Sequence, residues 1–187
     1  MVNNVGIPLP RGKMYHFLDI DNLATFINNI FNINLTAFNH MMEIIIPIMT
    51  KNKNGIVINL SSIAGLIPFP KLTMYSGSKF AIDYTSIGLY NEYANMGICI
   101  KSLVPGFVYT DLSKDYKFPP WFMPNAKTYT KHAINDLQVH NRTAGYNIHI
   151  ITMFLIEIFT MIKLIMGFDV IVFVYNYVSY YVNKYFL

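Results

Sequence analysis

The sequence of 187 residues is short of cysteine and of charge. Its one cysteine, Cys99, excludes an internal disulfide and a cysteine cluster for zinc, and its apolar surroundings in the sequence predict a buried, unreactive thiol. Charged residues make up 13% of the chain, roughly half the usual quarter, whereas 53% are hydrophobic and 16% aromatic. This composition excludes a disordered chain and predicts either one very buried domain or a domain that touches a membrane.

The sequence also lacks the patterns of several binding functions. Its net charge is +4, but the lysines and arginines are scattered, without a basic run or a stripe that alternates basic and aromatic residues. We therefore expect no nucleic-acid partner, and a mildly basic surface near anionic lipid or an anionic ligand is the better interpretation. No metal site is expected either, and residues 1–13 lack the apolar core of a secretory signal.

Three short segments have the composition of β-strands. Residues 55–62, GIVINLSS, and residues 98–106, ICIKSLVPG, are rich in β-branched side chains, and Pro105 ends the second of them. Residues 1–10 begin as the stub of a strand and are then broken by a glycine and two prolines. These three segments are the strands that we expect in the fold.

Two helical segments separate these strands. Apolar spacing predicts a helix over residues 21–49, with Asp21 as its N-terminal cap, and a second from Tyr75 to Met96 that stops at Gly97. Strands that alternate with helices need crossover connections. We therefore expect an α/β fold with a doubly wound, mainly parallel sheet and helices on both faces.

Residues 148–187 form an apolar tail beyond this α/β portion, which we place at residues 1–147. Glu157, Lys163 and Asp169 interrupt the tail, so no uncharged window reaches the roughly 18 to 20 residues of a confident spanning helix. Gly167 and Asp169 predict a break between two helices. We expect contact with a membrane surface, and the alternatives are a pair of buried helices or a dimer face. Tyrosines expected near the lipid headgroups are Tyr175, Tyr177, Tyr180, Tyr181 and Tyr185.

Ser62, Tyr75 and Lys79 stand at intervals that can bring three polar groups together. Tyr75 and Lys79 are four positions apart on the second expected helix, so they share one face. Ser62 follows a strand, and the loop after it can return Ser62 to Tyr75. Parallel sheets of this kind bind ligands outside the carboxyl ends of their strands. The sequence therefore predicts a hydroxyl, a phenol and an ammonium group that converge at this edge.

These groups suit the reduction of a carbonyl. A phenol has a pKa near 10, and lowering it to near 7 takes roughly 4 kcal/mol of preferential stabilisation of the phenolate. The ammonium group of Lys79 can supply much of that, while Ser62 donates a hydrogen bond to the substrate oxygen and Tyr75 gives the proton. The spacing of the three residues also arises by chance, so its meaning depends on the rest of the sequence.

Five elements in the right order resemble the short-chain dehydrogenase/reductase family. They are NNVG at Asn3–Gly6, NINLTA around Asn34, NLSSIAG around Ser62, YSGSK from Tyr75 to Lys79, and VPGFVYT at Val104–Thr110. The resemblance covers nearly the whole chain. It implies a partial Rossmann-type sheet and hydride transfer with a nicotinamide cofactor.

The resemblance implies a role for each matching residue. Tyr75 is implied as proton donor or acceptor, with Lys79 beside it, and Ser62 as catalytic and substrate-binding. Asn34 stands where the family has the catalytic asparagine that holds a water in the proton relay. Taken singly, Asn34 also fits a polar helix-face residue, and the proline–glycine pair a plain turn. The implied cofactor-binding residues are Asn3, Gly6, Tyr75, Lys79, Pro105, Gly106, Val108 and Thr110.

A closer resemblance is to the subgroup of 17-beta-hydroxysteroid dehydrogenases and very-long-chain 3-oxoacyl-CoA reductases. It rests on FLDIDNLATFINNIFNINLTA, LYNEYANMGI and NRTAGYNIH. It implies NADPH as cofactor, a location at the endoplasmic reticulum membrane, and a lipid-type ketone substrate, either a 3-oxoacyl-CoA or a 17-keto steroid. The segment from Ser113 to Thr130, with Phe118, Trp121 and Phe122, is expected in a substrate lid.

The family's T-G-x-x-x-G-x-G loop, whose amides cradle the cofactor pyrophosphate, has no counterpart in this sequence. We therefore expect a fragment of a longer enzyme, which folds poorly alone because a parallel strand is left as an edge, and which does not bind NADPH tightly. The alternative function is a non-catalytic, membrane-associated remnant that acts by binding, for example by pairing with a full-length relative. A homodimer is a further expected assembly.

Overall fold

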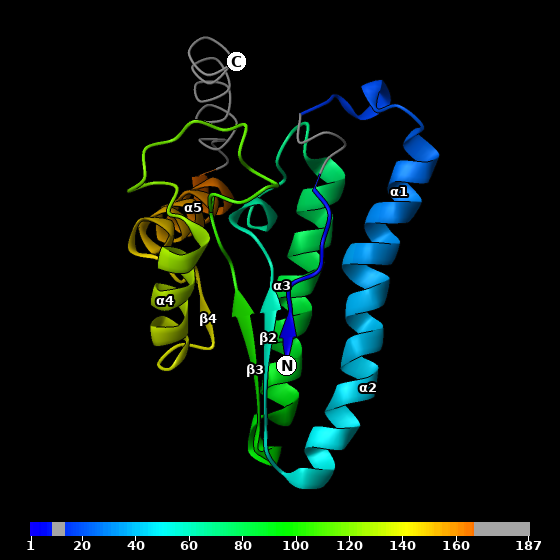
Figure 1. Ribbon diagram of the computed structural model, residues 1–187, viewed down its shortest axis with the longest axis vertical. Helices are drawn as coiled ribbons and strands as arrows, with labels where there is room; N and C mark the ends of the chain where they lie inside the picture. Colours follow the sequence, from blue (N-terminus) through cyan, green and yellow to red (C-terminus); the bar gives the residue numbers. More distant parts are fainter. Residues whose placement is uncertain (9–13, 167–187) are drawn as a thin grey trace.

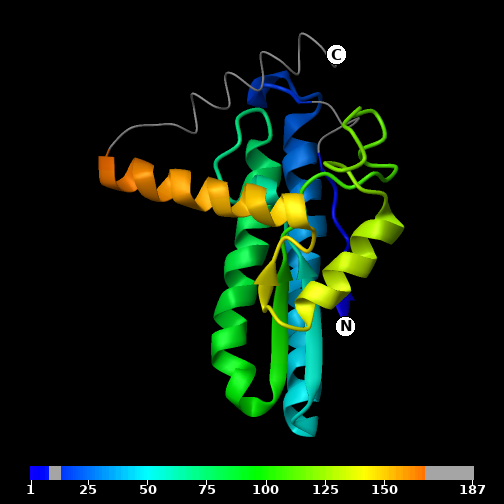
Figure 2. The same ribbon diagram turned by 90° about the vertical axis from the view of Figure 1, so that its left-hand side faces the viewer.

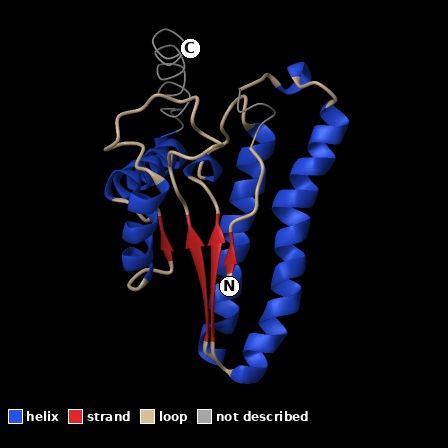
Figure 3. Cartoon of the chain, in the orientation of Figure 1, coloured by secondary structure: helices blue, strands red, loops and turns tan. Residues whose placement is uncertain are grey.

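The computed structural model describes residues 1–8 and 14–166 (Figure 1). The predicted helix break at Gly167 and Asp169, and the five tyrosines of the tail, lie outside these residues. Most described elements form one α/β unit, in which long helices run alongside the strands of a small sheet (Figure 3).

The strands form a parallel sheet in the order β1-β2-β3-β4. Each pair of strands next to one another along the chain also pairs in space, so each connection crosses over a face of the sheet. This confirms the expected parallel sheet. β1 lies at the edge, as expected, and Val2 is 59% exposed. The strands are β1 (Val2–Asn3), β2 (Gly55–Leu60), β3 (Ile98–Leu103) and β4 (Arg142–Thr143).

The first long helical column is built from three consecutive elements, which Figure 1 shows end to end. They are α1 (Leu23–Phe31), a π-helical turn at Asn32–Thr36 and α2 (Ala37–Asn52). The prediction of Asp21 as the cap is wrong. The helix begins at Leu23, and Asn22 before it adopts a left-handed conformation with φ of 51° and makes no side-chain cap bond.

The second long helix agrees with its sequence pattern. α3 (Thr73–Tyr93) passes into a 3-10 turn (Ala94–Met96), and Gly97 ends it with a φ of 81°. A left-handed residue at this position suits glycine because it has no Cβ. Four further elements complete the described fold. They are 3-10 turns at Phe17–Asp19 and Ile63–Gly65, α4 (Ala126–Leu137) and α5 (Asn147–Met166).

Helices cover both faces of the sheet. Successive side chains of β3 point to opposite faces, so each face has side chains that pack against a helix. Ile98 and Ile100 face the side covered by α2 and α3, where they pack with Val57 of β2. Leu103 faces the other side and packs with residues of α4. The view in Figure 2 separates α3 from α4 on either side of the strands. This arrangement confirms the expected fold class.

Cys99 is half-buried rather than buried, which corrects the expectation of a fully enclosed thiol. It lies at the beginning of β3, on the α4 side of the sheet, where its thiol is 3.5 Å from Asn141 Oδ1. Its apolar neighbours Ile98 and Ile100 both face the other side of the sheet, so they do not surround it.

α5 begins against the rest of the fold, contacts it as far as Glu157, and its far end projects past α3 (Figure 2). Within the described residues, Asn147–Ile165 is the one stretch long and apolar enough to cross a membrane, and 6% of it is buried. Among the described residues, α5 is therefore an exposed helix. Its most exposed apolar side chains are Ile151, Phe154, Leu155, Met161, Leu164 and Ile165.

A buried ion pair ties α5 and β4 to α3. The Asp83 carboxylate, 3% exposed, accepts hydrogen bonds from Arg142 at 2.9–3.2 Å and from Ser102 at 2.5 Å. Arg142 also binds Glu157 of α5, whose side chain is 43% exposed. The same guanidinium therefore has one buried and one exposed carboxylate partner.

We predict that the two carboxylates contribute very differently to stability. Asp83→Asn leaves Arg142 without its buried counterion and should lower the free energy of unfolding by about 3 kcal/mol or more. Glu157→Gln removes the exposed partner of the same guanidinium and should cost less than about 1 kcal/mol. Urea unfolding followed by circular dichroism measures both, and equal losses would contradict the assignment of Asp83 as the anchor.

Candidate active site

The candidate site lies at the carboxyl ends of β1, β2 and β3. Because the strands are parallel, the segments that carry Gly6, Ser62 and Gly106 all leave the sheet at the same end, where the strands finish. A backbone hydrogen bond of 2.9 Å from Ile63 N to Pro105 O joins the second segment to the third. The sheet thus brings together three of the five elements that the sequence singled out.

The Ser62 side chain lies close enough to the Tyr75 phenol to lower its pKa. Ser62 has an extended backbone and its Oγ also accepts a bond of 3.2 Å from Ala64 N, which fixes the start of the 3-10 turn. Tyr75 packs among apolar residues of α1 and of the segment after β1. The predicted meeting of the serine and tyrosine is present in the fold.

The pKa of Tyr75 is raised, whereas we expected it to be lowered. Desolvation is the larger cause, and the Ser62 side chain offsets it only in part. Burial disfavours the charged phenolate, and in this fold that cost outweighs the help from neighbouring groups. Tyr75 therefore holds its proton firmly at neutral pH.

Lys79 is buried, with 6% of its surface exposed, and lies one helical turn from Tyr75. Its Nζ donates a hydrogen bond of 2.9 Å to Leu60 O at the end of β2 and is 5.8 Å from the centroid of the Tyr75 ring. Burial lowers its pKa from 10.5 to about 8. The ammonium form therefore still dominates at neutral pH, but the group titrates in an accessible range.

Asn34 is fully buried in the π-helical turn between α1 and α2. Its Oδ1 accepts from Ile7 N at 2.8 Å, and its Nδ2 donates to Ile7 O at 3.0 Å. The same Nδ2 is 3.0 Å from Ser78 Oγ on α3. Such turns are inserted in α-helices at functional sites, because the extra residue turns a side chain toward a new partner. Here that partner is the backbone after β1.

Gly6 lies between two of these polar groups. A Cβ added at Gly6 would be 3.3 Å from Lys79 Nζ and 3.4 Å from Asn34 Oδ1. A methyl group at Gly6 would therefore make a tight contact with the Lys79 ammonium group, which would have to move by a few tenths of an ångström. The constraint at Gly6 is this close approach rather than its φ.

The remaining residues implied for cofactor binding lie along the same edge but have other contacts. Asn3 donates a hydrogen bond of 2.8 Å to Asn59 on β2. Val108 packs against the apolar cluster beneath α4. Thr110 is exposed, and Ser113 Oγ lies 3.1 Å from its backbone nitrogen. These contacts place the backbone of the segment but do not test a role in binding.

The residues present fit the nicotinamide end of a dinucleotide cofactor. Gly6 leaves a cradle that a Cβ would fill, and a cationic and an amide group flank it. An uncrowded backbone beside hydrogen-bonding groups is the kind of surface that a ribose and a planar amide can approach. The fit is confined to this end, because the sequence has no T-G-x-x-x-G-x-G spacing.

Sequence reasoning missed three residues that hold the site in place. Ser61 Oγ donates to Lys79 O at 2.6 Å, and Ser78 Oγ donates to Tyr75 O at 2.8 Å. His149 of α5 accepts from Gly106 N at 3.3 Å. Ser61 and Ser78 could have been found from the sequence, because each adjoins a predicted site residue. His149 ends the segment NRTAGYNIH, which carries the subgroup resemblance, but its partner Gly106 is 43 positions away, so the sequence did not indicate this contact.

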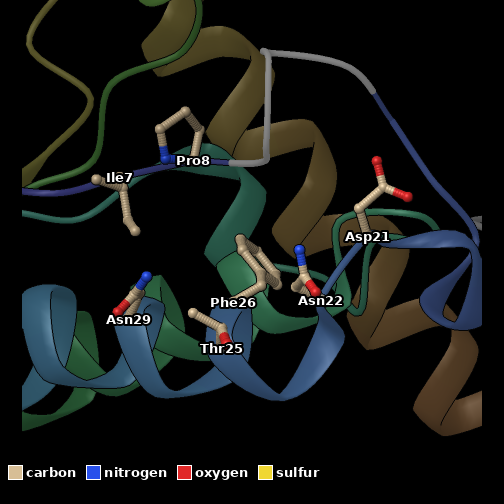
Figure 4. Close-up of a pocket in the computed structure, with 7 residues that line it drawn as sticks. All are labelled: Ile7, Pro8, Asp21, Asn22, Thr25, Phe26 and Asn29. Atoms are coloured by element: carbon tan, nitrogen blue, oxygen red, sulfur yellow. The ribbon is translucent and has the colours of Figure 1, made fainter.

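A separate cavity of about 270 Å³ opens beside the site, between the segment after β1 and α1. Polar and apolar residues both line it, and Figure 4 shows Ile7 and Phe26 facing one another across it. Ile7 and Phe26 both also pack with Tyr75, so the cavity adjoins the candidate site without containing it. The other lining residues are Pro8, Asp21, Asn22, Thr25 and Asn29.

The family model for short chain dehydrogenases matches residues 1–118. The chain belongs to this family. Very-long-chain 3-oxoacyl-CoA reductases are among its relatives: the protein of Rattus norvegicus is 37% identical over 81% of this chain and 47% of its own length, and that of Homo sapiens is 36% identical over 80% and 47%. The chain thus spans about half the length of the curated relatives it matches.

Solved structures agree with this family assignment. ElxO with NADP bound aligns with a TM-score of 0.60 and 25% identity over 78% of this chain and 62% of that one. The bulky-bulky ketone specific alcohol dehydrogenase from Comamonas testosteroni aligns with a TM-score of 0.62 and 20% identity, over 73% and 50%. The second likeness shows the fold alone. The chain is therefore an oxidoreductase-family protein with a Rossmann-like sheet.

We predict that stability rises with pH as Lys79 loses its proton. Between pH 8 and 10 the unfolded chain still binds the proton that the folded chain has released, so the free energy of unfolding increases with pH. The difference between 10.5 and about 8 corresponds to a ceiling of roughly 3 kcal/mol. Urea unfolding at several pH values should show this rise, and Lys79→Met should abolish it. A wild-type profile as flat as that of the variant would contradict the burial of an ionisable Lys79.

Proposed function

We propose that this chain is the catalytic portion of a nicotinamide-dependent reductase of lipid ketones, with Tyr75 as proton donor. The observation that carries the proposal is the position of the Ser62 side chain beside the Tyr75 phenol, with the buried Lys79 ammonium group 5.8 Å from the centroid of the Tyr75 ring. A hydroxyl, a phenol and an ammonium group close together are the parts that carbonyl reduction requires.

In this proposal the Ser62 hydroxyl and the Tyr75 phenol both contact the substrate carbonyl oxygen. Ser62 donates a hydrogen bond that strengthens as negative charge develops on that oxygen. Tyr75 then transfers its proton to the same oxygen. With its raised pKa the Tyr75 phenol enters the reaction protonated but as a weaker acid, so its proton transfer depends on stabilisation of the phenolate.

Lys79 and Asn34 act on Tyr75 rather than on the substrate. The ammonium group stabilises the phenolate that remains after proton transfer, because an opposite charge nearby favours the ionised form. Asn34 fixes the segment after β1 against α3, which keeps Gly6 beside Lys79. We propose the water-holding role in the proton relay for Asn34 as well.

NADPH is the proposed cofactor, and it would supply a hydride to the carbonyl carbon when bound. Gly6 would accept the nicotinamide end without a steric clash, beside Tyr75 and Lys79. Two solved forms of ElxO, one with NADP bound and a tyrosine-to-phenylalanine variant with NADPH bound, support the phosphorylated cofactor. The further residues proposed to contact it are Asn3, Pro105, Gly106, Val108 and Thr110.

A 3-oxoacyl-CoA is the proposed substrate. The names of the curated relatives favour it over a 17-keto steroid. The predicted lid supplies an apolar wall, because the ring of Phe118 lies 5.0 Å from Phe107 and 5.2 Å from Phe122, centroid to centroid. Trp121 at its rim is 63% exposed. Packed aromatic rings of this kind suit an acyl chain or another apolar ligand.

The exposed apolar side chains of α5 support contact with a membrane surface, and we propose the endoplasmic reticulum membrane. Scattered apolar residues are ordinary on a protein surface, but a helix of 20 residues that is apolar for most of its length is not. A homodimer through this face is the competing assembly.

A non-catalytic binding role is the second proposed function, and one observation favours it. β1 pairs with β2 on one side, and within the described residues no strand pairs with its other side. An open parallel edge can accept a strand from another chain. The partner in this proposal is a longer relative that supplies the neighbouring strand.

We predict that, if the chain turns over substrate, Tyr75→Phe abolishes turnover while NADPH binding survives. Loss of the phenolic proton should lower the rate of reduction of a long-chain 3-oxoacyl-CoA by at least about 100-fold. The matched control is Tyr84→Phe, which removes a hydroxyl from an exposed tyrosine on the same helix. Fluorescence titration of NADPH and a steady-state assay in detergent measure the two effects. A folded wild-type sample that binds no NADPH would favour the non-catalytic role.

We also predict that Gly6→Ala weakens NADPH binding by about tenfold, or roughly 1.4 kcal/mol. The added methyl group would lie 3.3 Å from Lys79 Nζ, in the space proposed for the cofactor. Gly77→Ala is the control, because a Cβ there meets no atom within 4 Å. Equal affinities for wild type and Gly6→Ala, in the same titration, would place the cofactor elsewhere.

A further inference from the structure

The His149 side chain joins α5 to two distant points of the segment 104–125. It is 1% exposed and lies in the first turn of α5. Its Nδ1 lies 3.3 Å from Gly106 N, and its Nε2 lies 3.0 Å from Phe122 O. A backbone N–H can only donate and a carbonyl can only accept. Both bonds form together only when Nδ1 is bare and Nε2 carries the proton.

The backbone of Gly106 lies against the imidazole ring of His149, where a Cβ would not fit. A Cβ added at Gly106 would lie 2.8 Å from His149 Cδ2 and 3.1 Å from its Cγ and Nε2. Contacts this short do not occur with real Cβ atoms, so the ring can lie on the backbone only where no side chain intervenes. The glycine of the proline–glycine pair therefore has a specific partner inside this chain.

Aromatic rings hold the imidazole in this orientation. Tyr146 meets it edge-on with ring centroids 5.3 Å apart, and Tyr129 lies at 5.8 Å. His132 of α4 meets the Tyr146 ring edge-on, with ring centroids 5.2 Å apart. Burial lowers the pKa of His149, and the carbonyls of Phe122 and Phe107 oppose that effect only in part. The surroundings thus favour the neutral imidazole that the two bonds require.

We propose that His149 is a positioning residue. Its neutral form, protonated at Nε2, hydrogen-bonds Gly106 and Phe122 at the same time, and this pair of bonds, here called the clasp, sets the shape of the segment between them. That segment carries Val108, Thr110 and the stacked rings of the expected lid. The clasp also links the segment to α5, the helix with the exposed apolar face. Only its effect on catalysis rests on the proposed function, because the clasp itself is a property of the fold.

The first test reads the tautomer directly. ¹⁵N NMR of the full chain, labelled at histidine and held in detergent, should show His149 with a protonated Nε2 and an unprotonated Nδ1 near neutral pH. A charged ring, or the opposite tautomer, would overturn the proposal, since neither allows both bonds. This measurement needs neither cofactor nor substrate.

The second test separates positioning from general stability. In His149→Phe, an aromatic ring of similar shape with no nitrogen, hydrogen exchange at residues 104–125 should speed up by about tenfold or more, while β2 and β3 exchange as before. His132→Phe is the control, because that histidine is exposed and contacts the Tyr146 ring. Faster exchange throughout the sheet, or no change at Gly106, would overturn the proposal.

Partial rescue should follow the geometry of the two bonds. His149→Asn keeps an acceptor near the Nδ1 position and should restore protection at Gly106 alone. His149→Gln keeps a donor near the Nε2 position and should restore order near Phe122. If wild type turns over substrate, the KM values of His149→Phe should rise by about tenfold with a smaller change in kcat. If wild type is inactive, the proposed function fails, while the tautomer and exchange results still decide the role of His149.

Discussion

The parallel pairing of β2 with β3 is the constraint on which the candidate site depends. Six residues of one strand face six of the other in register, so both strands end at the same height. The segments that carry Ser62 and Pro105 therefore leave the sheet together, and a hydrogen bond from Ile63 N holds them. A slip of one residue would turn the buried side chains of a strand to its other face and separate the two segments.

Burial determines the positions and shifts the pKa values of the polar groups in this site. Lys79 and Asn34 are removed from water and satisfied by backbone groups, and their positions are therefore strongly determined. The same desolvation acts on both Tyr75 and Lys79. It lowers the pKa of Lys79 and raises that of Tyr75, so each neutral form is favoured. Tyr75 is therefore protonated at neutral pH, and its phenolate form depends on neighbouring groups for stabilisation.

α5 is attached to the α/β unit by polar contacts as far as Glu157 and leaves an apolar surface beyond them. Glu157 binds Arg142, and His149 binds the segment after β3. Because polar contacts inside a protein are directional, they fix the angle at which the helix leaves the body. A surface that contacts lipid through the far part of α5 would thus lie at a defined orientation to the site.

The sequence by itself determined the parallel α/β class and the partnership of Tyr75 with Lys79, because strand composition and the four-residue helical interval are local properties. It also indicated the family, which the match over residues 1–118 confirms; the catalytic roles remain predictions. Only the tertiary structure decided the bonds of Asn34, the upward shift in the pKa of Tyr75 and the place of His149. Those depend on desolvation and on contacts between distant segments, and the local sequence determines neither.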